Sequence, residues 1–206
     1  HLVAGLYSHC CLKAVSFKVF LRVVDIMKRI NVIGTSGSGK STVARNLASI
    51  LDCPHVEMDI FHWKPNWKNA SKKEFLSDIV ESTSGLSWVL DGNYNHTQSI
   101  KWANVDTVVW VDYSWGRTLY QASKRAVIRA VMKKENWPGT GNVESFRKTF
   151  FSRDSVLLWT MKSYKDNKVY YEKIIENKEY SHIDFIRLTS PRETKRFIAS
   201  LAANRR

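Results

Sequence analysis

Short apolar segments recur along the chain, and most are followed by a stretch whose apolar side chains are three or four residues apart. Apolar segments of about four to eight residues, bounded by turn residues, are typical of buried strands in parallel sheets. Five such segments are present, at 30–33, 55–59, 87–92, 105–111 and 184–188. The pattern therefore predicts five strands.

The stretches between these strands carry the helical period. Three helices are predicted most clearly, at 40–51, at 71–84 and from 191 onward. In the second helix Ser71 occupies the N-cap position and Glu74 follows at the capping-box position, while Phe75, Ile79 and Val80 are expected to form the apolar face. Strands that alternate with helices predict an α/β fold with right-handed crossovers.

The turn after the first strand has the pattern G-x-x-x-x-G-K-[ST] of a phosphate-binding P-loop. The residues predicted to bind nucleotide are Gly34, Thr35, Ser36, Gly37, Ser38, Gly39, Lys40, Ser41 and Thr42. Glycines allow backbone N–H groups to surround phosphate oxygens, and the following helix directs its positive end toward them. Lys40 is expected to reach the β- and γ-phosphates of ATP, and the Ser41 hydroxyl to hold Mg²⁺. A Gly/Ser-rich turn without a ligand would leave the strand before it and the helix after it unexplained.

Carboxylates end two of the predicted strands. Asp91 ends the segment 87–92, at a position where P-loop proteins commonly place a carboxylate that holds Mg²⁺. Glu57 and Asp59 end the segment 55–59, and ligands of open α/β sheets bind at the carboxyl ends of strands. Asp59 is therefore the candidate for binding a phosphate acceptor and accepting its proton. The alternative is an aspartate that caps a turn.

A dense aromatic segment, Phe61-His62-Trp63-Lys64-Pro65-Asn66-Trp67, follows the second predicted strand. Leaving so many rings exposed without a use would be costly. The rings are expected either to cover the core or to form the wall of a pocket, and the sequence does not choose between these two possibilities.

The segment 117–153 is strongly basic, with nine Lys or Arg residues and two acidic residues. Arg125, Arg129 and Lys133 are spaced four residues apart, which places like charges along one stripe of a helix and favours a bound anion. Residues 137–142 then break the helix with Pro and Gly. The pattern predicts a lid made of two basic helical arms joined by a tip. The alternative is a solvated basic face.

Composition adds limits to this picture. A chain of 206 residues is expected to form one domain with its own core, and its net charge of +13 indicates an anionic partner, which could be nucleotide phosphate, nucleic acid or a membrane surface. The sequence has no uninterrupted run of 18 apolar residues, so no transmembrane helix or membrane partner is predicted. Cys10, Cys11 and Cys53 form no C-x-x-C pair, which favours reduced thiols and the cytoplasm.

Residues 1–27 differ from the rest of the chain. The sequence begins with His1, and Met27 directly precedes the first predicted strand. We expect 1–27 to be an extension outside the fold and 28–206 to be the domain. The extension is interpreted as upstream sequence before a natural start at Met27, or alternatively as a basic, acid-poor presequence for mitochondrial import.

The P-loop followed by Val89-Leu90-Asp91-Gly92 resembles the adenylate kinase group of nucleoside-phosphate kinases. More closely, the chain is similar to P-loop proteins known as adenylate kinase-like or DNA topology modulation proteins. The resemblance covers about residues 28 to 202. Its matching segments are Asp59 with 63–67, 90–94, 137–139, 144–147 and 152–155.

This resemblance implies a three-layer α/β/α fold with a five-stranded parallel sheet, binding of ATP and Mg²⁺, and a mobile lid over about 117–153. It does not identify the phosphate acceptor. Adenylate kinases carry Phe-Pro-Arg after Leu-Asp-Gly, whereas this chain carries Asn93-Tyr94-Asn95. The arginine that grips the acceptor phosphate is therefore missing at that place, which argues against AMP as the acceptor.

The predicted function is transfer of the γ-phosphoryl group of ATP to a small-molecule or nucleotide acceptor. The residues predicted to act in catalysis are Lys40, Asp59, Arg125, Arg129 and Arg153, with Ser41 and Asp91 as the Mg²⁺ ligands. A P-loop ATPase that acts on DNA and a nucleotide-dependent regulator without turnover are the alternatives. Nucleic acid is the less favoured partner, because the basic residues cluster where a lid should close.

Overall fold

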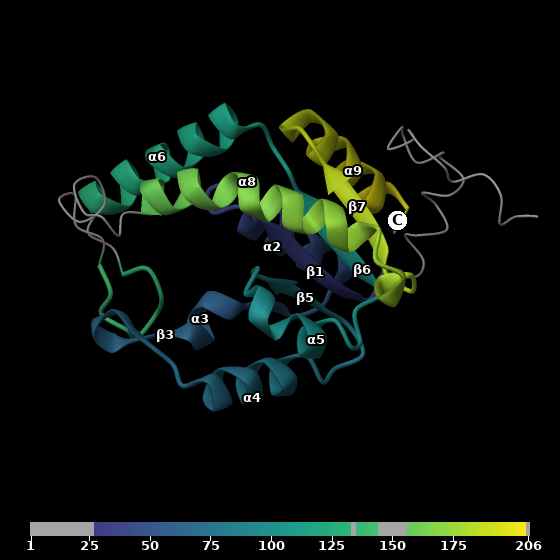
Figure 1. The fold of residues 1–206 in the computed structure, drawn as a ribbon, viewed down its shortest axis with the longest axis horizontal. Coiled ribbons are helices and arrows are strands. Elements are labelled where there is room, and N and C mark those ends of the chain that lie inside the picture. Colours follow the sequence, from purple (N-terminus) through teal and green to yellow (C-terminus); the bar gives the residue numbers. More distant parts are fainter. Residues whose placement is uncertain (1–26, 133–134, 144–155, 205–206) are drawn as a thin grey trace, which may run out of the picture.

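A five-stranded parallel sheet forms the centre of the computed structural model, which describes residues 27–132, 135–143 and 156–204 (Figure 1). Its strand order is β2-β5-β1-β6-β7. The strands are β1 (Arg29–Gly34), β2 (His55–Glu57), β5 (Trp88–Asp91), β6 (Thr107–Val111) and β7 (Asp184–Leu188). The order changes direction at β1, and such a switch point is where open α/β sheets bind ligands.

The central strand β1 is buried from Ile30 to its end. It pairs with β5 on one side, where Ile30 lies opposite Val89, and with β6 on the other, where Ile30 lies opposite Thr107. The Asp106 carboxylate accepts a hydrogen bond from the Arg29 backbone N–H at 2.8 Å. This contact fixes the start of β1, and it explains why the otherwise apolar segment 105–111 contains an aspartate.

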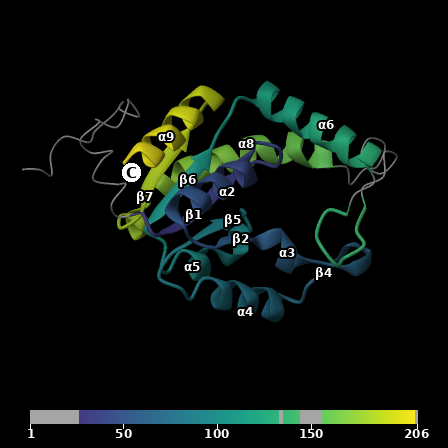
Figure 2. The same cartoon turned by 180° about the vertical axis from the view of Figure 1, so that it is seen from behind.

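Helices cover both faces of the sheet. The helices of more than one turn are α2 (Lys40–Leu51), α3 (Met58–His62), α4 (Lys72–Ser82), α5 (Gln98–Lys101), α6 (Trp115–Met132), α8 (Val156–Ile175) and α9 (Pro191–Ala203). Short 3₁₀ turns cover Pro65–Trp67, Asn95–Thr97 and Lys178–Tyr180. Helices α2 and α9 pack on one face, while α4, α5 and α8 pack on the other (Figures 1 and 2). The predicted three-layer α/β/α fold with a five-stranded parallel sheet is confirmed.

Each face of the sheet has its own core. Leu47 of α2 and Leu201 of α9 are fully buried in the first core, together with apolar side chains from β1, β5 and β6. The second core is built around larger rings, including Trp88 and Trp102. Asn31 lies buried within β1, where its Oδ1 accepts a hydrogen bond from Trp102 Nε1 at 2.8 Å. This bond satisfies a polar group that would otherwise be costly to bury.

Two details of the predicted elements are wrong. Segment 55–59 is a strand only as far as Glu57, because the chain turns into α3 at the buried Met58 and carries Asp59 into the first turn of that helix. In α4, Ser71 accepts a hydrogen bond from the Glu74 backbone N–H, as predicted. Val80, however, is 54% exposed, because it lies one residue beyond Ile79 and points away from the core.

Two segments project beyond the carboxyl edge of the sheet. Strands β3 (Trp63–Lys64) and β4 (Lys68–Asn69) form a small antiparallel hairpin, which we call the aromatic hairpin. Helix α6 leads to residues 135–143, which we call the tip, where an isolated bridge pairs Glu135 with Val143. Helix α8 returns to the sheet and packs against α6 (Figure 1).

The first described residue, Met27, is buried in the first core with 1% exposure. It was placed with the extension by its sequence, yet its side chain belongs to the packed domain. Residues 1–26 lie outside the described residues, as do 133–134, 144–155 and 205–206. Within the part that is described, no helix is long and apolar enough to cross a membrane.

Candidate active site

A cavity of about 810 Å³ opens at the carboxyl edge of the sheet. It lies between the P-loop, the ends of β2 and β5, helix α6, the aromatic hairpin and the tip. The predicted site residues that line it are Ser36, Gly37, Gly39, Lys40, Ser41, Thr42, Asp59, Arg125 and Arg129. Gly34, Thr35, Ser38 and Asp91 are buried beneath its floor, and Arg153 lies outside the described residues.

The backbone of the P-loop has a geometry that suits the binding of an anion. Gly39 is the N-cap of α2 in a left-handed conformation (φ 93°), and apart from its chain neighbours no described residue has an atom within 4 Å of the position that a Cβ would occupy there. The cap makes no side-chain hydrogen bond, so the first N–H groups of α2 remain directed at the cavity. Lys40, the first residue of the helix, stands beside them.

The P-loop also touches α6 closely. At Gly37 (φ 83°) a Cβ would come within 2.6 Å of the Ala122 Cβ, so only glycine fits. Three residues further along α6, Arg125 Nη2 donates a hydrogen bond to Ser36 Oγ at 3.1 Å. Arg129 follows one helical turn later and lines the same cavity. The part of the basic stripe that the structure describes therefore faces the phosphate site.

Asn93 fixes the position of Gly34, the first residue of the P-loop. Its Oδ1 accepts a hydrogen bond from the Gly34 N–H at 2.9 Å, and its Nδ2 donates to the Gly34 carbonyl at 2.8 Å. The buried Lys101 donates from Nζ to the Asn93 carbonyl, and burial lowers the pKa of Lys101 to about 7. Sequence reasoning missed both residues. The only available signal was an asparagine directly after Leu90-Asp91-Gly92.

The predicted metal ligands meet beneath the P-loop. Asp91 is 5% exposed, and burial raises its pKa, whereas the Lys40 ammonium and the Ser41 hydroxyl act in the opposite direction. Among the described residues Asp91 Oδ1 has no hydrogen-bond partner. A buried carboxylate oxygen without a partner, next to a hydroxyl, fits a Mg²⁺ that takes its remaining ligands from phosphates and water. The residues present therefore suit the ion.

Asp59 lines the same cavity as the P-loop, from the first turn of α3. The Tyr94 hydroxyl donates a hydrogen bond to Asp59 Oδ1 at 2.7 Å. Burial, followed by the charge of Asp59, raises the pKa of Tyr94, so the phenol stays protonated and remains a donor. Burial also lowers the pKa of the neighbouring His62, although Asp59 opposes this shift. Glu57 also lines the cavity, where it forms an ion pair with Arg45 at 3.7 Å.

The aromatic segment serves both purposes that its sequence left open. Phe61 packs against the second core. Trp63 and Trp67 line the cavity instead, as does Trp137 of the tip. The Trp63 and Trp137 rings stack with centroids 5.6 Å apart and planes 17° apart, and Trp67 meets both rings edge-on at 5.7 Å.

Asn142 completes the contact between the tip and the aromatic hairpin. Its Oδ1 accepts a hydrogen bond from the Trp67 N–H at 2.9 Å, and its Nδ2 donates to the Lys64 carbonyl at 2.9 Å. We call the three tryptophans together with Asn142 the clasp. The predicted break in the helix at 137–142 is confirmed, and its tip rests on the hairpin.

Comparison with known proteins leaves the family open. No protein-family model matches the chain, and no curated protein matches it. Among solved structures, a gluconokinase from Sinorhizobium meliloti 1021 is 18% identical (86% of this chain, 94% of that chain, TM-score 0.44). A sugar kinase from Janibacter sp. HTCC2649 is 16% identical (86% and 93%, TM-score 0.48), and a shikimate kinase from Bacteroides thetaiotaomicron is 12% identical (86% and 97%, TM-score 0.49). Likeness at this level assigns no activity, so function has to be inferred from the site itself.

Proposed function

We propose that the protein is a P-loop kinase that transfers the γ-phosphoryl group of ATP to a hydroxyl group of a small molecule. The observation that carries this proposal is the pairing of two features across one cavity. A P-loop whose following helix has no side-chain cap lines the cavity, and the Asp59 carboxylate lines the same cavity. An anion site and a proton acceptor that face the same space are what phosphoryl transfer to a hydroxyl requires.

The donor side would hold the triphosphate of ATP. Backbone N–H groups of the P-loop and the first turn of α2 would bind the phosphate oxygens, and Lys40 would neutralise charge on the β- and γ-phosphates. Ser41 and Asp91 would hold Mg²⁺, which when bound neutralises the developing charge between these phosphates. Asn93 supports this side indirectly, because it fixes Gly34 at the start of the P-loop.

The acceptor side would carry out proton transfer. The acceptor oxygen attacks the γ-phosphorus as the bond from that phosphorus to the β–γ bridging oxygen breaks, and ADP leaves with the electron pair. The proton of the acceptor hydroxyl passes to Asp59, whose other role is to orient that hydroxyl. The bond from Tyr94 holds the carboxylate in place for both tasks.

The arginines of α6 would stabilise the moving phosphoryl group. Arg125 contacts the P-loop through Ser36, and Arg129 lines the cavity one turn further on. Positive charge directed into a cavity favours a kinase over an ATPase that acts on DNA, because a DNA-binding surface would direct its charge outward along a groove. The resemblance to adenylate kinases at Asp91-Gly92 does not extend to the acceptor, since Asn95 stands where those proteins carry the arginine that grips the acceptor phosphate.

The test is a phosphoryl-transfer screen of hydroxyl compounds with labelled ATP and Mg²⁺, run on matched variants. Asp59→Asn should lower turnover by about 10²-fold or more with little change in ATP affinity, because it removes the proton acceptor and leaves the P-loop intact. Lys40→Ala should weaken ATP binding itself. Wild-type turnover in Asp59→Asn would reduce Asp59 to a residue that caps a turn, and unchanged ATP affinity in folded Lys40→Ala would refute the nucleotide site.

A further inference from the structure

Six rings form a continuous surface along the cavity, from the tip to the Asp59 carboxylate. Trp137 stacks on Trp63, Trp63 meets His62 with centroids 5.0 Å apart, and His62 meets Tyr94 at 4.8 Å. Tyr94 then donates its hydrogen bond to Asp59. The six rings, all of which line the cavity, are Trp63, Trp67, Trp137, His62, Tyr94 and His96. We call them the ring wall.

Two of these rings belong to residues whose backbone conformation is energetically unfavourable. Trp67 has φ 58° and Tyr94 has φ 25°, and both are bulky residues for which a positive φ is unusual. Such conformations persist where the surrounding structure enforces them, and they cluster at functional sites. At Trp67 the enforcing contact is the bond from its backbone N–H to Asn142 Oδ1, so the strain keeps the indole at the cavity.

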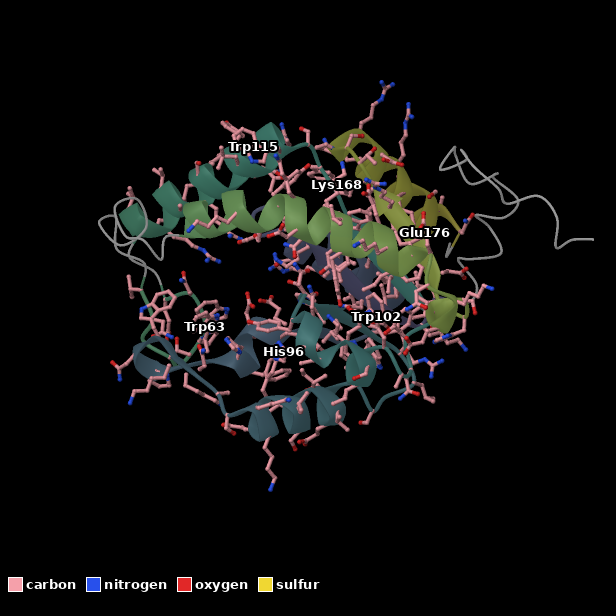
Figure 3. The ribbon with its side chains drawn as sticks, viewed as in Figure 1. Trp63, His96, Trp102, Trp115, Lys168 and Glu176 are labelled. Atoms are coloured by element: carbon pink, nitrogen blue, oxygen red, sulfur yellow. The ribbon has the colours of Figure 1, made fainter. Side chains whose placement is uncertain are left out.

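Packing alone does not account for the ring wall. Trp63 and Trp67 stay partly exposed at the cavity although they touch each other and Trp137, whereas the structural tryptophans Trp88 and Trp102 are 1% exposed. Figure 3 shows Trp63 in the aromatic hairpin and His96 nearer the sheet on the same side of the molecule, while Trp115 lies on the opposite edge at the start of α6. The polar groups among the rings are the indole N–H groups, the imidazoles and the Tyr94 hydroxyl, and burial lowers the pKa of His62.

We infer that the ring wall is the binding site for a planar aromatic or heteroaromatic ring on the phosphate acceptor, placed so that an attached hydroxyl reaches Asp59. The acceptor class is therefore an alcohol that carries such a ring. A flat ring adds a further member to the stacked rings, and stacking tolerates many ring types because every such ring has a π-face. This inference rests on the proposed function for the role of Asp59, but the ring site itself can be tested by binding alone.

The experiment uses two matched pairs of probes. Phenyl β-D-glucoside is compared with methyl β-D-glucoside, and adenosine with methyl β-D-riboside, so that each pair shares its sugar hydroxyls and differs in the planar ring. Affinities are measured by calorimetry and by tryptophan fluorescence with the full-length chain. We expect at least one ring-bearing probe to bind at least 10-fold more tightly than its partner.

The variants are Trp67→Asn and Trp63→Leu, with Trp115→Leu as the matched control. Asparagine tolerates a positive φ, so Trp67→Asn keeps the backbone conformation while it removes the ring. Both cavity variants should reduce the preference for the ring-bearing probe to below about threefold, and the control should retain it. Circular dichroism melts identify any variant that fails to fold, and the two cavity variants alter different parts of the wall.

Each outcome decides the inference. Equal affinity within both pairs, no saturable binding of either ring-bearing probe, or a preference that survives in both folded cavity variants would overturn it. ATP affinity measured on the same wild-type and Lys40→Ala samples reports separately on the proposed kinase. Absence of a ring preference in the wild-type protein with intact ATP binding refutes the ring site alone, and ring binding without ATP binding refutes the kinase alone.

Discussion

At the scale of single residues, the least expected finding is that polar side chains behind the P-loop shape the site as much as those that face it. Asn93 makes both of its amide hydrogen bonds to Gly34, and Lys101 in turn donates to the Asn93 carbonyl. Neither residue is expected to touch a phosphate. Together they determine where the first glycine of the loop lies.

Replacing Asn93 should therefore weaken nucleotide binding from a distance. Asn93→Ala removes two hydrogen bonds and leaves the polar groups of Gly34 without partners, which should lower the free energy of unfolding by about 1–3 kcal/mol. We expect the Kd for ATP to rise by about tenfold, which corresponds to about 1.4 kcal/mol. Asn46→Ala, at an exposed position of α2, is the control. An unchanged Kd for ATP would show that the P-loop keeps its geometry without the two hydrogen bonds between Asn93 and Gly34.

Lys101 makes stability depend on pH. Its pKa is about 7 in the folded protein because of burial, below the ordinary value of 10.5, so between these values the unfolded chain binds a proton that the folded chain does not. The free energy of unfolding should then rise with pH from about 7 to 10. Below pH 7 it should be lower by the full cost of charging the buried amine. Lys101→Met should flatten this rise in urea unfolding curves recorded across that range. An equal slope in both proteins would contradict a buried, neutral amine.

At the scale of elements, helix α6 serves two functions along one face. Its residue Ala122 packs against Gly37 of the P-loop, and Arg125 and Arg129 follow at one-turn intervals into the cavity. The two arginines lie at different parts of the site, because Arg125 bonds Ser36 of the P-loop and Arg129 lines the cavity one turn further along the helix. Arg125 contacts the P-loop and should therefore affect binding of the phosphate donor. Arg129 lies further along the helix and should affect stabilisation of the transferred phosphoryl group.

Arg129→Ala should therefore lower kcat by about 10²-fold with a much smaller change in ATP affinity, whereas Arg125→Ala should impair both. Lys124→Ala, on the exposed side of the same helix, is the control for a general loss of charge. Steady-state kinetics together with equilibrium ATP binding separate the two effects. Near-normal turnover in Arg129→Ala would leave the described basic stripe as a solvated face.

The elements themselves were largely predictable from the sequence. Buried parallel strands are nearly continuous apolar runs, so the five strands and the P-loop could be located from local pattern alone. The turn at Met58 was not predictable, because an apolar residue fits equally well in the last position of a strand and in the first turn of a helix. Asp59 was found as a candidate even though its element was wrong.

The aromatic hairpin and the tip could not be placed from the sequence. Their association depends on Asn142, which bonds Lys64 from 78 positions away, and no local pattern encodes such a pairing. The left-handed backbone at Trp67 is equally invisible, since sequence rules expect Gly or Asn where φ is positive. The pocket-wall role of Trp63 and Trp67 was therefore one of two open possibilities until the fold was known.

At the scale of the whole molecule, the cavity is enclosed by a closed circuit of contacts. The P-loop touches α6, α6 leads to the tip, the clasp joins the tip to the aromatic hairpin, and the hairpin returns through α3 to β2 of the sheet. Two links in this circuit are neither strands nor continuous chain, namely the contact between the P-loop and α6, and the clasp. Because the P-loop has to keep its geometry to bind phosphates, the clasp is the contact that we expect to open when substrates enter and products leave.

Weakening the clasp should speed product release. Asn142→Ala removes two hydrogen bonds between the tip and the hairpin, one of which holds the Trp67 backbone, and it removes no ring of the ring wall. Product release or lid opening limits turnover in many enzymes. If it does so here, kcat should rise in this variant, and the KM for the acceptor should rise as well. Comparing single-turnover with steady-state rates tests this expectation. A burst of product followed by an unchanged steady-state rate in the variant would place the slow step elsewhere.

The strained backbone at Trp67 also has an evolutionary consequence. Substitution by glycine or asparagine would relieve a local cost of about 1–2 kcal/mol, so selection for folding alone should steadily remove the tryptophan. A lineage that lost its acceptor would be expected to drift to glycine or asparagine at position 67 and still keep Trp102, which is fully buried in the core. The identity of residue 67 in distant descendants would then record whether the acceptor was still in use.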